Sequence, residues 1–132
     1  MTYLGEEIKK LGFGLMRLPQ KEDVIDVEQV KEMVDRFLEA GFTYFDTAWA
    51  YPGSEDAIRQ ALVERYPREK FQLATKNAAW INCKTREEAV SQFETSLKQT
   101  GAVILITIFF TISVNHEPKS LMILICGILF WK

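Results

Sequence analysis

The sequence predicts an α/β fold in which about three strand–helix units build a parallel sheet. Two observations carry this prediction. Segments with strand character alternate with segments of helical periodicity between residues 11 and 101. The predicted strands end near Arg17, Asp46 and Lys76, a spacing of about thirty residues that matches the length of one strand–helix unit. Such units join parallel strands by right-handed crossovers and place helices against the sheet.

The first unit opens with Leu11–Leu18, an apolar segment with two glycines that is typical of a short strand. Asp26 is a suitable N-cap for the following helix, with Gln29 three residues later as a capping-box partner. One face of that helix carries the apolar residues Val27, Val30, Val34, Phe37 and Leu38. Gly41 follows, where a left-handed residue ends a helix. Phe42–Asp46, rich in aromatic and β-branched residues, is the second predicted strand.

The second helix is expected to have Ser54 as its N-cap and to end before Pro67. Its inner face consists of Ala57, Ile58, Ala61 and Leu62. The third strand is Phe71–Lys76. These features repeat the order of the first unit, which supports a sheet of parallel strands.

The third helix begins with a second capping box, formed by Thr85 and Glu88. Its predicted inner stripe is Ala89, Val90, Phe93 and Leu97. Gly101 is the expected stop. Val103–Phe109 is β-branched and apolar, so this segment can add a fourth strand beside Phe71–Lys76.

The composition is that of a globular chain, but it changes after Gly101. The 132 residues carry a formal net charge of −2, which gives no reason to expect nucleic acid as a partner. Cys83 and Cys126 are too few for a disulfide framework or a metal cluster, and the polar start lacks a secretory pattern. We therefore expect a cytoplasmic protein without a metal site. Residues 102–132 hold only two of the 16 lysines and arginines and one of the 18 acidic residues.

Three polar residues stand where a parallel sheet gathers its chemistry, at the carboxyl ends of the strands. Asp46 and Lys76 each end a predicted strand, and Tyr51 lies in the loop after Asp46. A single charged residue at a strand end is more often a solvated loop residue, and a loop tyrosine more often packs. The candidate site therefore depends on the three residues taken together.

Three separated motifs closely resemble those of the aldo/keto reductase family. Gly41–Ala48, which reads GFTYFDTA, is followed by Tyr51 and Glu55 and resembles the family signature around its second strand. Leu73–Lys76, LATK, resembles the third strand, and Leu11–Arg17, LGFGLMR, resembles the first. The motifs occur in the family's order, with spacings that fit one topology.

The resemblance implies that residues 1–102 are the amino-terminal part of a (β/α)8 TIM barrel that reduces aldehydes and ketones with NADPH. The family's catalytic residues are Asp, Tyr, Lys and His, and Asp46, Tyr51 and Lys76 match the first three. The positions that it places near the nicotinamide are Gly14, Met16, Arg17 and Asp46. For Gly14, close packing of the first strand is the alternative interpretation.

The residue types suit this reaction. Hydride addition to a carbonyl leaves negative charge on its oxygen, which must receive a proton. Free tyrosine is too weak an acid for this at neutral pH, and a neighbouring ammonium favours tyrosinate. We therefore expect Tyr51 to be the general acid, Lys76 to strengthen it, and Asp46 to hold Lys76.

Three aromatic residues are expected on or beside the mouth of the barrel: Phe13, Trp49 and Trp80. They can line an apolar substrate pocket or simply cover the rim. Nothing near Cys83 in the sequence indicates a reactive thiol, so we expect it to be inert.

The resemblance ends after Ala102. The family continues with a strand like GYFDYYLLH, whose histidine is the fourth catalytic residue, whereas Val103–Thr111 reads VILITIFFT and the single histidine, His116, lies in a polar turn. In a shifted reading frame, each codon consists of the last base of one residue's codon and the first two bases of the next. Over residues 102–111 such codons permit the sequence GYFDYYLLH. We therefore expect residues 103–132 to be a non-family tail created by a frameshift, and the 132-residue chain to be a truncated and inactive form.

Other interpretations of the tail and of the whole chain stay open. The apolar runs 102–114 and 121–131 could contact a membrane, but each is shorter than the roughly twenty residues that span one. The chain could also be a non-catalytic interaction protein with an exposed sheet face. Open strand edges favour self-association, and the lack of later family loops predicts very weak NADPH binding.

Overall fold

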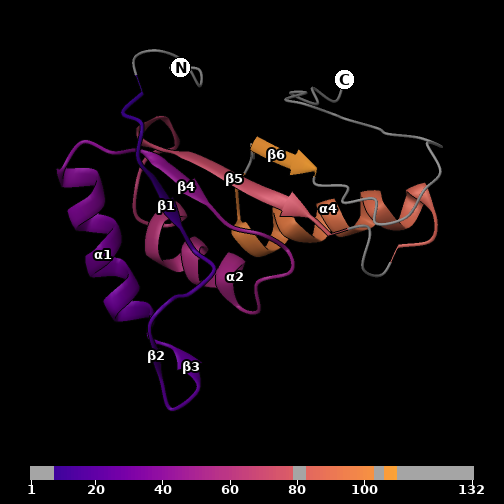
Figure 1. Cartoon of the computed structure of the whole chain (residues 1–132), viewed down its shortest axis with the longest axis horizontal. Helices are drawn as coiled ribbons and strands as arrows, with labels where there is room; N and C mark the ends of the chain where they lie inside the picture. Colours follow the sequence, from indigo (N-terminus) through magenta and orange to yellow (C-terminus); the bar gives the residue numbers. More distant parts are fainter. Residues whose placement is uncertain (1–7, 79–82, 103–105, 110–132) are drawn as a thin grey trace.

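The computed structural model describes residues 8–78, 83–102 and 106–109. Four parallel strands form one sheet, in the order β1 (Gly12–Gly14), β4 (Tyr44–Asp46), β5 (Gln72–Asn77) and β6 (Ile106–Phe109). Figure 1 shows the helices α1 (Val27–Glu39), α2 (Ser54–Ile58) and α4 (Arg86–Thr100) along one side of this sheet. The predicted parallel α/β arrangement is confirmed, and residues 106–109 form the expected fourth strand beside β5.

The first strand is shorter than the predicted Leu11–Leu18. After β1, the amide of Leu15 still donates to the carbonyl of Asp46 at 2.8 Å, and the chain then leaves the sheet. It forms a small antiparallel hairpin of β2 (Gln20–Lys21) and β3 (Val24–Ile25), which the sequence did not predict. The hairpin turn consists of Glu22 and Asp23, with φ of 52° and 63°. The common two-residue hairpin turns have such positive φ values and usually contain Asn-Gly or Asp-Gly. Glu22-Asp23 lacks this sequence signal, so the hairpin was not predicted.

Helix α1 follows the sequence prediction at both ends. The carboxylate of Asp26 accepts a hydrogen bond from the Gln29 amide at 3.1 Å, as an N-cap should. Val30 and Val34 are fully buried on its inner face. Gly41, with φ of 79°, follows the helix and turns the chain towards β4.

The second helix starts one residue earlier than predicted. Gly53, with φ of 73°, is the N-cap, and Ser54 is the first helical residue. The Ser54 hydroxyl is occupied elsewhere: it donates to the carbonyl of Leu15 at 2.9 Å and lies 2.8 Å from the hydroxyl of Thr47. Helix α2 continues directly into the π-helical turn η1 (Arg59–Val63), and a short 3₁₀ turn, η2 (Arg68–Lys70), precedes β5. The predicted inner face is buried throughout, at Ala57, Ile58, Ala61 and Leu62.

Helix α4 has the predicted ends but not the predicted inner stripe. The capping box between Thr85 and Glu88 is formed, and Gly101 adopts a left-handed conformation with φ of 63°. Val90, however, is 45% exposed. The buried positions are instead polar: Gln92, Ser96 and Thr100. The Gln92 side chain accepts a hydrogen bond from the Ala78 amide, and the Thr100 hydroxyl donates to the Ser96 carbonyl, so these polar side chains can face inwards. A search for apolar periodicity does not detect such a face.

The core lies between the helices and the sheet. Phe45 on β4 is fully buried, and its ring centroid lies 5.2 Å from that of Phe37 and 5.7 Å from that of Phe13. Around these rings the fully or almost fully buried apolar residues are Leu15, Val30, Val34, Ile58, Ala61, Leu62, Phe71, Leu73 and Ala102. This packing joins β1, β4 and α1 into one body and holds the carboxyl ends of the strands in place.

One polar cluster ties α1 to the turn after η1. The Asp35 carboxylate accepts from the Arg65 guanidinium at 2.8 Å and from the Tyr66 hydroxyl at 2.6 Å. The hydrogen bond from Arg65, supported by that from Tyr66 and opposed by burial, lowers the pKa of the Asp35 carboxyl below its ordinary value of 3.8. Because the pKa of Asp35 is lower in the folded state, its ionised carboxylate stabilises the fold above about pH 4. This contribution is lost as the pH falls through the pKa of the folded state.

We therefore expect Asp35→Asn to lower the free energy of unfolding by about 1 kcal/mol at pH 7, because the cluster is only partly exposed. The difference from wild type should shrink as the pH falls from 5 towards 3, as measured by urea denaturation. Glu28→Gln is the matched control on the same helix, since Glu28 is 81% exposed in its pair with Lys31. An equal difference at all pH values would contradict this prediction.

Two absences concern only the described residues. None of the described helices is long and apolar enough to cross a membrane. The same residues contain no group of three or more His, Cys, Asp or Glu that could hold a metal ion. Trp80, His116, Cys126 and most of the apolar tail lie outside the described part of the chain.

Candidate active site

Asp46 and Lys76 meet at the carboxyl ends of two neighbouring strands. Asp46 is the last residue of β4 and pairs in register with Ala74 of β5, so that Lys76 lies two residues further along the adjacent strand. The ammonium of Lys76 donates a hydrogen bond to the Asp46 carboxylate and another to the carbonyl of Thr47 at 2.8 Å. The structure therefore brings together the two charged residues that the sequence singled out.

Tyr51 completes the group. Its loop is a tight turn in which the Tyr51 amide donates to the carbonyl of Ala48 at 3.0 Å. This turn places the Tyr51 ring beside the amine, with the Lys76 Nζ 5.2 Å from the ring centroid. Such a distance is within the range of a cation–π interaction. Asp46 and Tyr51 thus both lie at the Lys76 ammonium, so the three predicted residues are together. Their catalytic role stays a prediction.

The ion pair is partly withdrawn from water. The side chain of Lys76 is 15% exposed and that of Asp46 is 31% exposed. Charges at this depth are screened less by solvent and salt than charges on the surface. The ammonium is therefore held at one place, and it can act on a phenol or on a negative charge that develops beside it.

The two glycines of β1 differ in what surrounds them. A Cβ atom at Gly12 would lie 2.9 Å from the Tyr44 ring, so close packing requires glycine there. A Cβ atom at Gly14 would meet nothing within 4 Å, although Gly14 pairs directly with Asp46. Packing within the described chain therefore does not account for Gly14. The backbone surface at Gly14, beside Asp46, is therefore open within the described residues.

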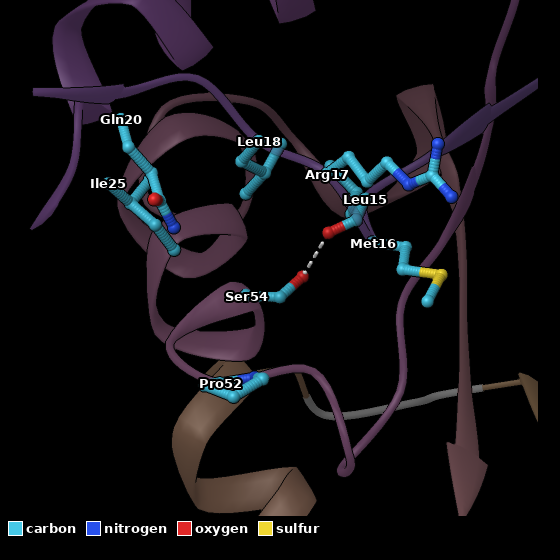
Figure 2. Close-up of a pocket in the computed structure, with 8 residues that line it drawn as sticks. All are labelled: Leu15, Met16, Arg17, Leu18, Gln20, Ile25, Pro52 and Ser54. Carbon is cyan, nitrogen blue, oxygen red and sulfur yellow. Dashed lines mark hydrogen bonds between the residues drawn. The ribbon is translucent and has the colours of Figure 1, made fainter. Parts of the chain in front are cut away.

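A pocket of about 310 Å³ lies next to this group, between the end of β1, the hairpin and the start of α2. Its lining residues are Leu15, Met16, Arg17, Leu18, Gln20, Ile25, Pro52 and Ser54. Figure 2 shows the side chains of Met16 and Arg17 extending away from Ser54 and Pro52. The lining includes two predicted cofactor residues but none of Asp46, Tyr51 and Lys76, so the pocket adjoins the candidate site rather than containing it.

A family model of the aldo/keto reductases matches residues 10–103, which is more than half of the chain. The chain belongs to the aldo/keto reductase family. Its sheet and helices are part of a (β/α)8 barrel, and the barrel strands end at the same edge, where Asp46 and Lys76 lie.

Solved aldo-keto reductases share this fold over most of the described chain. The Pseudomonas aeruginosa protein PA4992, itself assigned to the family, has a TM-score of 0.63 at 18% identity and covers 77% of this chain and 42% of its own. The holo form of aldo-keto reductase AKR11C1 from Bacillus halodurans has a TM-score of 0.56 at 26% identity and covers 77% and 36%. An aldo-keto reductase from Klebsiella pneumoniae, in complex with NADPH, has a TM-score of 0.59 at 21% identity and covers 77% and 34%.

The chain thus spans less than half the length of these three structures. A search among curated proteins found no match. The fold and the family of the described residues are therefore established, whereas the activity of a whole reductase is a matter for proposal.

Phe13 of this aldo/keto reductase chain does not lie at the mouth of the barrel, where the sequence predicted it. Its ring packs against Phe37 and Phe45 on the helix side of the sheet, so the expectation that it lines the mouth is wrong. Strand alternation explains this, because Gly12 and Gly14 occupy the opposite face. Trp49 is partly exposed, and its amide donates to the Lys76 carbonyl at 3.1 Å. Trp49 therefore stays a candidate for the rim.

A further set of contacts, not predicted from the sequence, lies directly after Lys76. The Asn77 side chain donates to the Ala89 carbonyl at 2.9 Å, and the Ala78 amide donates to the Gln92 side chain at 2.7 Å. Gln92 also donates to the Sγ of Cys83 at 3.8 Å, which gives that thiol a structural neighbour. Helix α4 thus fixes the end of β5 by polar contacts, which a search for apolar periodicity does not detect.

Proposed function

We propose that this chain carries the amino-terminal half of a carbonyl-reductase site that uses NADP, with Tyr51 as the general acid. The observation that carries the proposal is the Lys76 ammonium, which bonds to Asp46 and lies over the Tyr51 ring at the carboxyl edge of the sheet. Family membership supports it, and so does the NADPH complex of the Klebsiella pneumoniae relative. The substrate class is a small-molecule aldehyde or ketone.

In this mechanism NADPH, when bound, supplies the hydride. The Tyr51 hydroxyl donates its proton to the carbonyl oxygen as negative charge develops there. Lys76 lowers the energy of the phenolate left behind, because its ammonium is held at the ring by Asp46. Gly14, Met16 and Arg17 are the proposed cofactor contacts, with the open surface at Gly14 beside Asp46 as their structural support.

We also propose that the 132-residue chain does not catalyse this reaction by itself. The segment after Ala102 lacks the histidine that the family motif places at the end of its fourth strand. A frameshift near the Ala102 codon accounts for this tail, and sequencing of the coding DNA tests it. A second reading frame without codons for Tyr-Phe-Asp and the histidine would exclude the frameshift.

The cellular location that we propose for this protein is the cytoplasm.

The purified chain should show no carbonyl-dependent oxidation of NADPH above the rate without protein. Fluorescence titration should find NADPH binding much weaker than micromolar, because the chain covers at most 42% of the compared reductases. The protein read in the alternative frame is the positive control. Submicromolar binding or clear turnover by the 132-residue chain would contradict the proposal of inactivity.

An interaction protein is the second candidate. Among the described residues, β1 pairs only with β4 and β6 pairs only with β5, and such edges favour association. Stable co-purification with one partner in the absence of turnover would favour this candidate, while a membrane-flotation assay tests contact through the tail.

A further inference from the structure

We propose that Glu55 is a positioning residue for the proposed active site, acting through Thr75 on the strand that carries Lys76. This inference deepens the proposed function and rests on it. The first turn of α2 holds the strand ends from behind, on the side of the sheet opposite to the site. Its two contributing side chains are Ser54 and Glu55.

The contact between Glu55 and Thr75 is buried. Glu55 is 3% exposed and Thr75 is 1% exposed. The Thr75 hydroxyl donates to the Glu55 carboxylate at 2.6 Å. Successive side chains of a strand point to opposite faces, so Thr75 bonds to the helix while Lys76, the next residue, faces the site. The bond therefore fixes the backbone from which the Lys76 side chain extends.

Ser54 makes the corresponding contacts at the ends of β1 and β4. Its hydroxyl donates to the Leu15 carbonyl, directly after Gly14, and lies 2.8 Å from the hydroxyl of Thr47, directly after Asp46. Figure 2 shows the bond from Ser54 to Leu15. The ends of β1 and β4 and the last half of β5 are therefore tied to two adjacent residues of α2. The same turn holds the site loop, because the Ser54 amide donates to the Tyr51 carbonyl at 3.1 Å.

Stability alone does not account for a glutamate at this position. Its Oε1 takes the bond from Thr75, whereas Oε2 is buried and has no hydrogen-bond partner within the described part of the chain. A buried carboxylate oxygen without a partner destabilises the fold. An apolar pair of similar shape would fill the same space, so the hydrogen bond from Thr75 is what the glutamate contributes.

The test measures the geometry of the site by NMR and needs no turnover. The Tyr51 ring should move the ε-methylene proton signals of Lys76 upfield, because the amine lies over the ring. A Lys76→Arg variant assigns these signals, and Tyr51→Leu gives the value without the ring. In the double variant Glu55→Leu/Thr75→Val the upfield shift should fall to less than half. Glu55→Gln keeps an acceptor for Thr75 and should retain the shift.

The double variant is chosen because removing both partners leaves no unpaired hydroxyl, so the chain should still fold. Thr43→Val/Gln72→Leu is the matched control: it removes the 2.6 Å bond between the Thr43 hydroxyl and the Gln72 side chain at the other end of these strands. This control should keep the full Lys76 shift. A folded Glu55→Leu/Thr75→Val protein with an unchanged shift would overturn the inference, as would a wild-type protein without any upfield lysine signal.

The outcome is separable from that of the proposed function. A reduced shift in Glu55→Leu/Thr75→Val supports positioning whatever the turnover of the protein. The role of Tyr51 as the general acid is decided by kinetics on the protein read in the alternative frame.

Discussion

Replacing Tyr51 by phenylalanine should lower kcat by about 10²- to 10⁴-fold in the protein read in the alternative frame after Ala102. The variant keeps the ring over the Lys76 ammonium, where the two lie 5.2 Å apart, and removes only the hydroxyl. Hydride addition would then leave an alkoxide with no proton donor in place. Steady-state oxidation of NADPH with an aromatic aldehyde measures the effect.

Tyr66→Phe is the matched control for this experiment. The Tyr66 hydroxyl donates to Asp35 in the helix layer, away from the strand ends, so its loss should leave kcat unchanged. A decrease of less than threefold for Tyr51→Phe would remove Tyr51 from the proposed role. The same result would leave the ion pair of Asp46 and Lys76 as an element of structure only.

Replacing Phe45 by alanine should reduce the free energy of unfolding by about 3–5 kcal/mol, as is typical of a large aromatic residue in a core. The Phe45 side chain is fully buried, and its ring packs against those of Phe13 and Phe37. The cavity left behind would lie between β4 and α1, next to the strand end that carries Asp46. Urea denaturation followed by circular dichroism measures the loss.

Val24→Ala serves as the comparison, because Val24 is 68% exposed in the hairpin. We expect it to change the free energy of unfolding by no more than about 0.5 kcal/mol. A loss below 1 kcal/mol for Phe45→Ala would show that the ring cluster does not dominate the core.

Much of the fold could be predicted because its signals are local. Asp26 caps α1 by a bond to the third residue after it, and Thr85 and Glu88 cap α4 in the same manner. Each pattern is complete within four residues of sequence, so it needs no knowledge of tertiary structure. The fourth strand was predictable as well, since a β-branched apolar run suits a parallel sheet.

The errors arose where a distant partner decides the structure. Ser54 was expected to cap its own helix, but it bonds to the carbonyl of Leu15, which lies 39 residues earlier in the sequence. Gln92 is buried because the Ala78 amide needs an acceptor. Neither partner can be read from the residues near the side chain concerned. Apolar periodicity therefore assigned Val90 to the buried face of α4, although its side chain is exposed.

The candidate site was predicted better than its surroundings. The motif and the strand ends placed Asp46, Tyr51 and Lys76 together, and their side chains do converge. Phe13 was placed wrongly, although alternation along β1 already contained the answer. If the two flanking glycines face the barrel interior, the phenylalanine between them must face the helices.

Lys76 is joined to the loop after β4 by its side chain and by its main chain. Its amine donates to the Thr47 carbonyl at 2.8 Å, and its carbonyl accepts from the Trp49 amide at 3.1 Å. The segment from Thr47 to Trp49 cannot swing outwards unless both bonds break. This part of the rim therefore acts as a fixed wall rather than a moving flap, and any closure over a bound molecule must come from elsewhere.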